Sequence, residues 1–254
     1  MEPLSVRQNE IVGLAREQGR VDVDELSQTF SVSPQTIRKD LNDLCERRLL
    51  QRVHGGAVVG FGIENVSYEA RRLLATDAKQ RIGEEVARLI PDNSSLLINI
   101  GTTTEQVAHA LKSHHGLLVI SNNVNAVHIM KGFAGIELII AGGLVRLSDG
   151  GIVGDAAVDF INQFKVDYAV VGVSALDEDG SLLDYDLREV RVAQAIIRNA
   201  RHVILVADRL KLERSAPVRL SHVSEIDTIV TDTPFPQKLQ DICRAHDVDV
   251  VVAQ

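Results

Sequence analysis

The chain has 254 residues, of which 45% are hydrophobic and 24% are charged, the balance of a folded globular protein rather than a disordered one. Its formal net charge of −8 argues against a protein that coats nucleic acid without discrimination. The two cysteines, Cys45 and Cys243, lie far apart and lack the paired spacing of a zinc site. We therefore expect free thiols, no metal and no cofactor.

Two patterns divide the chain. Residues 1–58 have the spacing of short helices, whereas strand-like and helical runs alternate from residue 77 onward. We interpret 1–58 as a small helical domain, 59–76 as a linker and 77–254 as a larger α/β domain. The N-terminus lacks the pattern of a secretion signal, and no apolar run approaches the roughly 18 residues of a membrane span. These features predict a cytoplasmic protein with no membrane partner.

The first domain contains three predicted helices. Gly19 is a plausible end for the first helix, and Asp22 is placed to cap the second. Ser33 and Pro34 then open the third helix, with serine as the N-cap and proline at the first helical position.

The third helix is predicted to have one apolar and one polar side. Ile37, Leu41 and Leu44 project to one side and pack on the other helices. The opposite side carries side chains suited to base edges and phosphates: Gln35, Arg38, Lys39 and Asn42. Hydroxyl contacts to the DNA backbone are expected from Ser33 and Thr36. A solvated helix in a small bundle has the same periodicity, so the pattern by itself leaves that reading open.

The segment from Leu49 to Val58 contains Gly55 and Gly56 in an apolar and basic setting, which indicates a small β-hairpin. Residues 34–58 contain five basic and three acidic side chains, although residues 1–58 as a whole are close to neutral. Positive charge is therefore concentrated on the third helix and this hairpin, where Arg52 and His54 lie.

The second domain alternates buried strands with helices. Its strands are apolar on both faces, which predicts a mainly parallel sheet covered by helices on both sides. The predicted strands are 95–100, 117–121, 136–141, 168–173, 203–207, 228–231 and 248–252. The predicted helices are 77–90, 104–113, 123–131, 155–164, 187–200 and 236–246.

Small and polar residues follow the predicted strands at their carboxyl ends, which share one edge in a parallel sheet. Gly101 permits a tight turn before a helix whose first amide groups, with three threonine hydroxyls, can hold a phosphate. The ending of a nucleotide-binding P-loop is missing here. The predicted effector-binding residues are Gly101, Thr102, Thr103, Thr104, Ser121, Asn122, Asn123, Gly142, Gly143, Arg146, Ser174, Asp208 and Lys211. Arg146 and Lys211 are the cations expected to neutralise the phosphate.

The run at residues 31–41, followed by residues 52–57, resembles the winged helix-turn-helix of the DeoR family of bacterial sugar-catabolism repressors. The resemblance implies that Gln35, Thr36, Arg38 and Lys39 enter the major groove of double-stranded operator DNA. It also implies that Arg52 and His54 in the wing contact the flanking backbone or minor groove.

The second domain is similar to the effector domain of the same family, whose fold resembles that of ribose-5-phosphate isomerase. The segments that carry this resemblance are 99–103, 107–111, 148–154, 159–164 and 179–183, and the whole match covers about residues 5–233. It implies release from the operator by a phosphorylated inducer, glycerol 3-phosphate or a related sugar phosphate.

One position departs from the family pattern. Family members usually carry a basic residue shortly after the pair Glu189–Val190, where this chain has Ala193 and Gln194. Either Arg191 takes that role or the ligand differs.

Three functions remain open on the residues alone. A repressor needs half-sites about one helical turn apart, and therefore at least a homodimer, with a tetramer also allowed. A sugar-phosphate isomerase with an appended DNA-binding head would use acidic and lysine side chains near the strand ends. A metabolite-binding module whose head contacts protein is the third. The family resemblance favours a repressor that is not an enzyme.

Overall fold

The structure is a computed structural model that describes residues 4–18, 20–47, 49–53, 55–58 and 67–254. The chain forms two compact units, residues 1–74 and 75–254, and each is described by itself. The domain limits at 58 and 77 remain predictions. None of the described helices is both long and apolar enough to cross a membrane.

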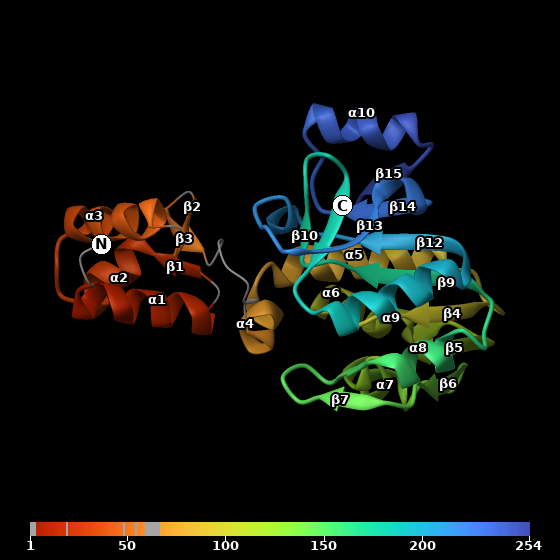
Figure 1. The fold of residues 1–254 in the computed structure, drawn as a ribbon. Coiled ribbons are helices and arrows are strands. Elements are labelled where there is room, and N and C mark those ends of the chain that lie inside the picture. Colours follow the sequence, from red (N-terminus) through yellow and green to blue (C-terminus); the bar gives the residue numbers. More distant parts are fainter. Residues whose placement is uncertain (1–3, 19, 48, 54, 59–66) are drawn as a thin grey trace. The chain divides into compact units, whose positions relative to one another are not determined.

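The smaller unit combines helices with a three-stranded antiparallel sheet (Figure 1). Its helices are α1 (Val6–Gln18), α2 (Val23–Thr29), α3 (Pro34–Glu46) and α4 (Tyr68–Leu73). Its strands are β1 (Arg20–Asp22), β2 (Gln51–Val53) and β3 (Gly56–Val58), in the order β1-β3-β2. The three predicted helices and the hairpin are confirmed. Strand β1 was not predicted, because three residues are too few to show a period.

Local chemistry fixes the start of α3 and the packing of the wing. Ser33 has an extended backbone and accepts a hydrogen bond from the Thr36 amide, and Pro34 opens the first turn. Ile37, Leu41 and Leu44 are fully buried, as predicted. A Cβ on Gly56 would lie 2.0 Å from the Val21 carbonyl oxygen, so the close approach of β3 to β1 requires glycine.

The larger unit contains a seven-stranded sheet in which every pair is parallel. The order is β15-β14-β12-β9-β4-β5-β6. The strands are β4 (Ser95–Ile98), β5 (Leu117–Ser121), β6 (Ile136–Ile140), β9 (Val166–Gly172), β12 (Ala200–Val206), β14 (Thr228–Thr231) and β15 (Asp249–Val252). The parallel sheet and its seven strands are confirmed.

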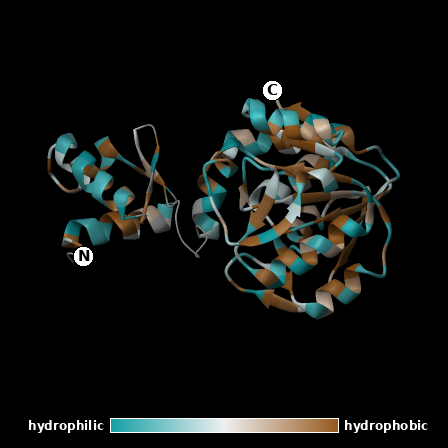
Figure 2. Cartoon of the chain, turned by 45° about the horizontal axis from the view of Figure 1, so that its top comes forward, coloured by the Kyte–Doolittle hydropathy of each residue, from teal (hydrophilic) through white to brown (hydrophobic). Residues whose placement is uncertain are grey.

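Helices cover both faces of this sheet, and two separate apolar clusters fill the space beneath them. One cluster joins the sheet to α5 (Thr76–Leu89), α6 (Thr102–Ala110) and α7 (Val124–Met130). The other joins it to α8 (Asp155–Ile161), α9 (Leu187–Arg198) and α10 (Gln237–Ala245). In Figure 2 the central strands are accordingly brown, while the outer helices carry teal.

The strand order creates a topological switch point. The chain fills β4, β5 and β6 in one direction, then returns to β9 on the other side of β4 and continues outward to β15. In Figure 1, β6 and β7 lie at one end of this unit and β14 and β15 at the other. Open parallel sheets bind ligands outside the carboxyl ends of their strands at such a point. The turn after β4 occupies this position.

Short strands and turns complete the larger unit, and the strands were not predicted. A hairpin pairs β7 (Leu144–Arg146) with β8 (Gly151–Val153), and a small antiparallel sheet contains β10 (Ala175–Leu176), β11 (Ser181–Asp184) and β13 (Val218–His222). Single 3-10 turns are η1 (Leu111–Ser113), η2 (Arg209–Lys211) and η3 (Val223–Glu225). Strands β11 and β13 are distant in sequence, and the strands of the two hairpins have too few residues to show a period.

Candidate functional site

The outer side of α3 carries exposed polar side chains. Gln35, Arg38, Lys39 and Asn42 are all exposed. Within the described parts of the chain, none of these four side chains forms a hydrogen bond or ion pair. Their donors and charges are therefore available to a partner outside the protein.

Two acidic residues of α3, Asp40 and Asp43, form hydrogen bonds with side chains of α1. Asp40 is buried and accepts a hydrogen bond from Arg7 Nε at 2.6 Å, which raises the pKa of Arg7. Asp43 accepts bonds from Gln8 at 2.8 Å and from Arg47 at 3.1 Å. Because these pairings offset the acidic charge, the exposed side of α3 presents net positive charge.

The remaining residues predicted to contact DNA differ in their surroundings. The Ser33 and Thr36 hydroxyls lie 2.9 Å apart and are hydrogen-bonded to one another, so one hydroxyl hydrogen of the pair is still available to a phosphate. Arg52 is exposed on β2. His54 lies outside the described residues.

The turn between β4 and α6 lies at the switch point of the larger unit. Gly101 has φ +149° and ψ 150°, a region that side-chain-bearing residues rarely adopt. The Thr104 hydroxyl lies 2.8 Å from the carbonyl oxygens of both Asn99 and Gly101, which fixes the turn from inside. Thr102 and Thr103 are also buried, in the first turn of α6. Helix starts leave amide groups without intrahelical partners, so this turn suits an anion.

The predicted residues after β5 and β6 differ in their surroundings. Ser121 donates to the Ile98 carbonyl at 2.7 Å, and Asn123 caps α7 by accepting from the Asn125 and Ala126 amides. These two buried side chains therefore hold strand β5 and helix α7 in place. Gly142 and Gly143, after β6, are exposed.

Buried lysines near the carboxyl edge supply positive charge. Lys211, in η2 after β12, is 9% exposed, and Asp208 caps the same turn through the Leu210 amide. Lys79 on α5 is 3% exposed and was not predicted. Gly83, one turn later, packs on Gln106 of α6, so this part of α5 lies against α6. Its place on the apolar stripe with Ile82 was the signal available in the sequence.

Arg146 is engaged by carboxylates within the unit. It donates to Asp149 at 2.7 and 2.8 Å, to Asp186 at 3.0 Å and to Glu189 at 2.5 Å. Burial alone would lower the pKa of Arg146, but the hydrogen bond to Asp149 and the charges of Glu189 and Asp149 raise it. Ser174 completes the surroundings by donating to Asp184 at 2.9 Å. Arg146 thus joins the β7–β8 hairpin to the start of α9.

The guanidinium of Arg146 does not neutralise all the carboxylates of this cluster, and the excess negative charge changes the pKa of Glu189. Burial and the nearby Asp184 raise the pKa of Glu189 from 4.5 to about 7, against the opposing effect of Arg146. Asp186 behaves oppositely, because hydrogen bonds from Arg188 lower its pKa to about 2.

The raised pKa of Glu189 predicts a stability that falls as pH rises. Between pH 4.5 and 7 the folded state holds a proton that the unfolded state has lost, so raising the pH favours unfolding. At about 1.4 kcal/mol per pKa unit, the loss from this group amounts to about 3 kcal/mol. Glu189→Gln should remove this pH dependence, as measured by urea unfolding across that range. If the free energy of unfolding changes with pH in the same way in both proteins, the pH dependence does not come from Glu189.

The departure from the family pattern has a structural counterpart. Ala193 is fully buried, and the Gln194 amide donates to the Leu220 carbonyl at 2.9 Å. Arg191 is exposed and pairs with Asp155 at 3.4 Å on the surface. None of the three therefore offers a buried cation beside the Gly101 turn.

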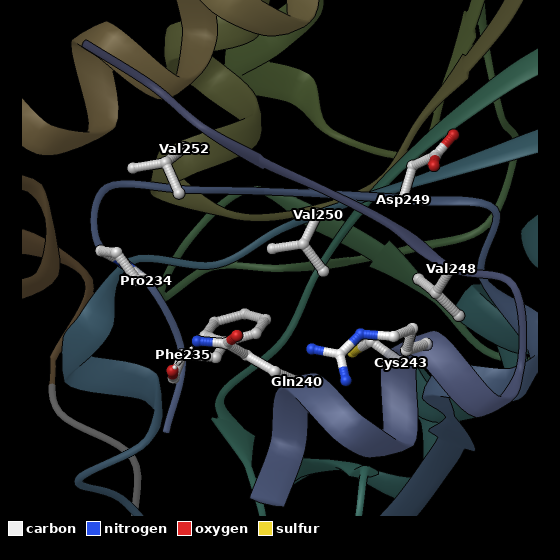
Figure 3. A pocket seen from close by; sticks show the side chains of 9 residues that line it. Pro234, Phe235, Gln240, Cys243, Val248, Asp249, Val250 and Val252 are labelled. Carbon is white, nitrogen blue, oxygen red and sulfur yellow. Dashed lines mark hydrogen bonds between the residues drawn. The ribbon is translucent and has the colours of Figure 1, made fainter. Parts of the chain in front are cut away.

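A cavity of about 290 Å³ lies away from the predicted effector residues, between α10 and β15 (Figure 3). Gln240 and Cys243 from α10 line it opposite Val250 and Val252. Its one cationic side chain, Arg244, is paired with Asp241 at 2.9 Å. Nothing in this lining suits a phosphate. Among the described residues no group of histidine, cysteine and acidic side chains could hold a metal ion, and Cys45 and Cys243 are free thiols.

Comparison with known families divides the chain into the same two kinds of unit. The DeoR-like helix-turn-helix domain matches residues 7–60, and the DeoR C terminal sensor domain matches residues 74–233. Among solved structures, translation initiation factor eIF-2B of Pyrococcus horikoshii OT3 is 15% identical with a TM-score of 0.53, covering 89% of this chain and 95% of that one. A ribose-5-phosphate isomerase in complex with phospho-erythronic acid aligns over 54% of each chain with a TM-score of 0.41.

Full-length relatives are similar over nearly the whole chain. The glycerol-3-phosphate regulon repressor of Escherichia coli is 44% identical, covering 96% of this chain and 97% of the relative. Its counterpart in Haemophilus influenzae is 46% identical, with coverage of 91% and 90%. The transcriptional repressor CsqR of Escherichia coli is 35% identical over 98% of this chain and 95% of the relative. By its two matched domains and by these relatives, the chain belongs to the DeoR family of helix-turn-helix transcriptional regulators.

Proposed function

We propose that this protein is a DNA-binding transcriptional repressor of a carbohydrate or glycerol catabolic operon, and that a phosphorylated metabolite such as glycerol 3-phosphate releases it from its operator. The observation that carries the proposal is the exposed polar side of α3 in a DeoR-type helix-turn-helix, where Gln35, Arg38, Lys39 and Asn42 have no partner among the described residues. The names of the relatives that match over more than nine-tenths of this chain support the glycerol-linked assignment.

On the DNA side, α3 is the reading helix. Arg38 and Lys39 suit guanine edges or phosphates, and Gln35 and Asn42 suit adenine. Thr36 and Ser33 are assigned to the phosphate backbone at the N-terminal end of the helix. Arg52 and His54 in the wing are assigned to the flanking backbone or minor groove.

On the effector side, the phosphate is assigned to the start of α6. Gly101, Thr102 and Thr103 surround that turn at the switch point, and Lys79 and Lys211 supply positive charge nearby. Ser121, Asn123 and Thr104 act by holding the strand ends in place. Because Arg146 is engaged by three carboxylates, we assign it to the hairpin that borders the site and not to the phosphate.

We propose a homo-oligomer, a dimer or a tetramer. Each chain has one reading helix, and two DNA half-sites one turn of the duplex apart need two reading helices. The larger unit also exposes apolar side chains at one end of its sheet, with Leu144 62% and Leu147 95% exposed, which suits contact with a second copy. Sedimentation equilibrium of the protein with and without Leu147→Asp tests this surface. A variant that keeps the assembly of the unchanged protein would exclude it.

An enzyme is the competing function, because the larger unit has buried acidic and lysine side chains at its carboxyl edge. The helix-turn-helix and the repressor names of the relatives favour a protein that is not an enzyme. Incubation of the purified protein with aldose phosphates separates the two functions. Conversion of an aldose phosphate faster than in buffer without protein would support the isomerase.

Thr102→Val should give a repressor that needs more effector to release the operator. The substitution keeps the volume but removes a hydroxyl at the proposed phosphate turn, so effector binding weakens while α3 is unchanged. Electrophoretic shift on the chain's own upstream DNA, titrated with glycerol 3-phosphate, measures both. We expect operator binding equal to that of the unchanged protein and at least roughly tenfold more effector for half-release, about 1.4 kcal/mol. Equal effector requirements would remove Thr102 from the site.

A further inference from the structure

Two buried asparagine side chains lie at neighbouring strand ends. Asn99 follows β4 and is 1% exposed, and Asn122 follows β5 and is fully buried. Within the described residues, neither Oδ1 atom receives a hydrogen bond. The Asn122 amide nitrogen donates to the Ile152 carbonyl at 3.1 Å, whereas the Asn99 amide forms no side-chain hydrogen bond with any described residue. Buried polar groups are normally paired, so both oxygens require an explanation.

The two asparagines are neighbours across the sheet. Ile98 pairs with Ser121 in the parallel register of β4 and β5, and each asparagine is the next residue along its strand. Adjacent strands lie about 4.8 Å apart, so the two side chains are within reach of one small molecule. Asn99 still donates its backbone amide to Val170 at 3.0 Å, so its strand remains extended there.

The asparagine pair also lies next to the proposed phosphate turn. Asn99 precedes Gly101 by two residues, a chain length of at most about 7 Å. The Thr104 hydroxyl joins the Asn99 carbonyl to the first turn of α6 at 2.8 Å. A molecule whose phosphate binds at the start of α6 would therefore bring its carbon chain to the two asparagine side chains.

We propose that Asn99 and Asn122 bind hydroxyl groups of the effector, so that the sensor selects a polyol or sugar phosphate over a phosphate ester without hydroxyls. This inference rests on the proposed function, which assigns a phosphorylated effector to this edge. Carbonyl oxygens accept from O–H groups, and the unpaired Asn99 amide can also donate to a hydroxyl oxygen. An ester without hydroxyls leaves both oxygens unpaired, and sites built for hydroxyls discriminate strongly for that reason.

The test compares two ligands that share a phosphate and differ in hydroxyls. Calorimetric titration of the full chain with glycerol 3-phosphate and with propyl phosphate measures the preference for hydroxyls directly. We expect the unchanged protein to bind glycerol 3-phosphate at least tenfold more tightly than propyl phosphate. Asn99→Leu should reduce that preference to about threefold or less, mainly by weakening glycerol 3-phosphate, while propyl phosphate affinity changes little.

Thr231→Val is the matched control. Thr231 is fully buried at the end of β14, and its hydroxyl also has no partner within the described residues. Three strands, β12, β9 and β4, lie between β14 and β5 in the sheet. This variant removes an equally buried unpaired oxygen and should keep the full preference. If Asn99→Leu does not fold, as judged by its melting transition, Asn99→Ala takes its place with the same expected loss.

The outcomes separate this inference from the function on which it rests. If the protein binds glycerol 3-phosphate and propyl phosphate equally, or if Asn99→Leu keeps the full preference, the asparagines do not bind hydroxyls and the phosphate site stands. If neither ester nor inorganic phosphate binds, the phosphorylated effector is wrong and this inference fails with it.

Discussion

Arg38→Ala lowers the affinity for operator DNA about 5- to 150-fold, which corresponds to about 1–3 kcal/mol for one well-placed base contact. Arg38 is exposed on α3 and unpaired within the described residues, so truncation leaves no internal partner unsatisfied. The loss is then a loss of DNA contact and not of folding. Electrophoretic shift with the operator measures it, and titration with glycerol 3-phosphate should show unchanged effector binding.

Arg198→Ala is the matched control for this change. Arg198 is exposed on the larger unit, so its removal changes the net charge by the same amount without touching the reading helix. Operator affinity should change less than threefold. If both variants bind the operator equally, or if Arg38→Ala weakens effector binding as much as DNA binding, the assignment of DNA reading to α3 is wrong.

Arg146→Met destabilises the larger unit by about 3–5 kcal/mol at pH 8. The arginine is the shared partner of Asp149, Asp186 and Glu189, and its side chain is only 19% exposed. Removing one partner from a buried ionic cluster leaves uncompensated charges, which is among the most costly of single changes. Urea unfolding followed by circular dichroism measures the free energy of unfolding.

Two comparisons make this expectation specific to the cluster. Arg188→Met removes the same charge from an exposed neighbour of Asp186 and should cost much less stability than Arg146→Met. Lowering the pH from 8 to 5.5 should restore part of the stability of Arg146→Met, because the raised pKa of Glu189 lets it take a proton within this range. An Arg146→Met protein as stable as the Arg188→Met protein would mean that the cluster does not hold the hairpin.

Periodicity and end signals in the sequence determined the framework of this protein. The apolar runs of the larger unit predicted all seven parallel strands, because strands covered on both faces must be apolar throughout. Ser33 and Pro34 located the start of α3, and the spacing of Ile37, Leu41 and Leu44 determined which side faces outward. These are local properties, so a sequence contains them without a fold.

The pairing of charges was decided only by the tertiary structure. Arg146 follows β6 closely enough to suggest that it binds a phosphate. Its guanidinium instead donates hydrogen bonds to Asp186 and Glu189, about 40 residues away in sequence. Asp40 lies on α3 itself but is neutralised by Arg7 from another helix. Which charge meets which depends on the folded arrangement of distant segments, and no spacing rule reports that.

Burial likewise distinguished side chains that look alike in sequence. Thr102, Thr103 and Thr104 are consecutive, but the Thr104 hydroxyl is used to hold the turn. Asn99 is a single amide at the end of an apolar run, and only the fold shows that its side-chain oxygen is buried beside Asn122, with no partner among the described residues. The sequence by itself determined the elements and the chemistry available at their ends. The tertiary structure decided which of those groups remain open to a ligand, because hydrogen bonds within the protein compete with the ligand for the same donors and acceptors.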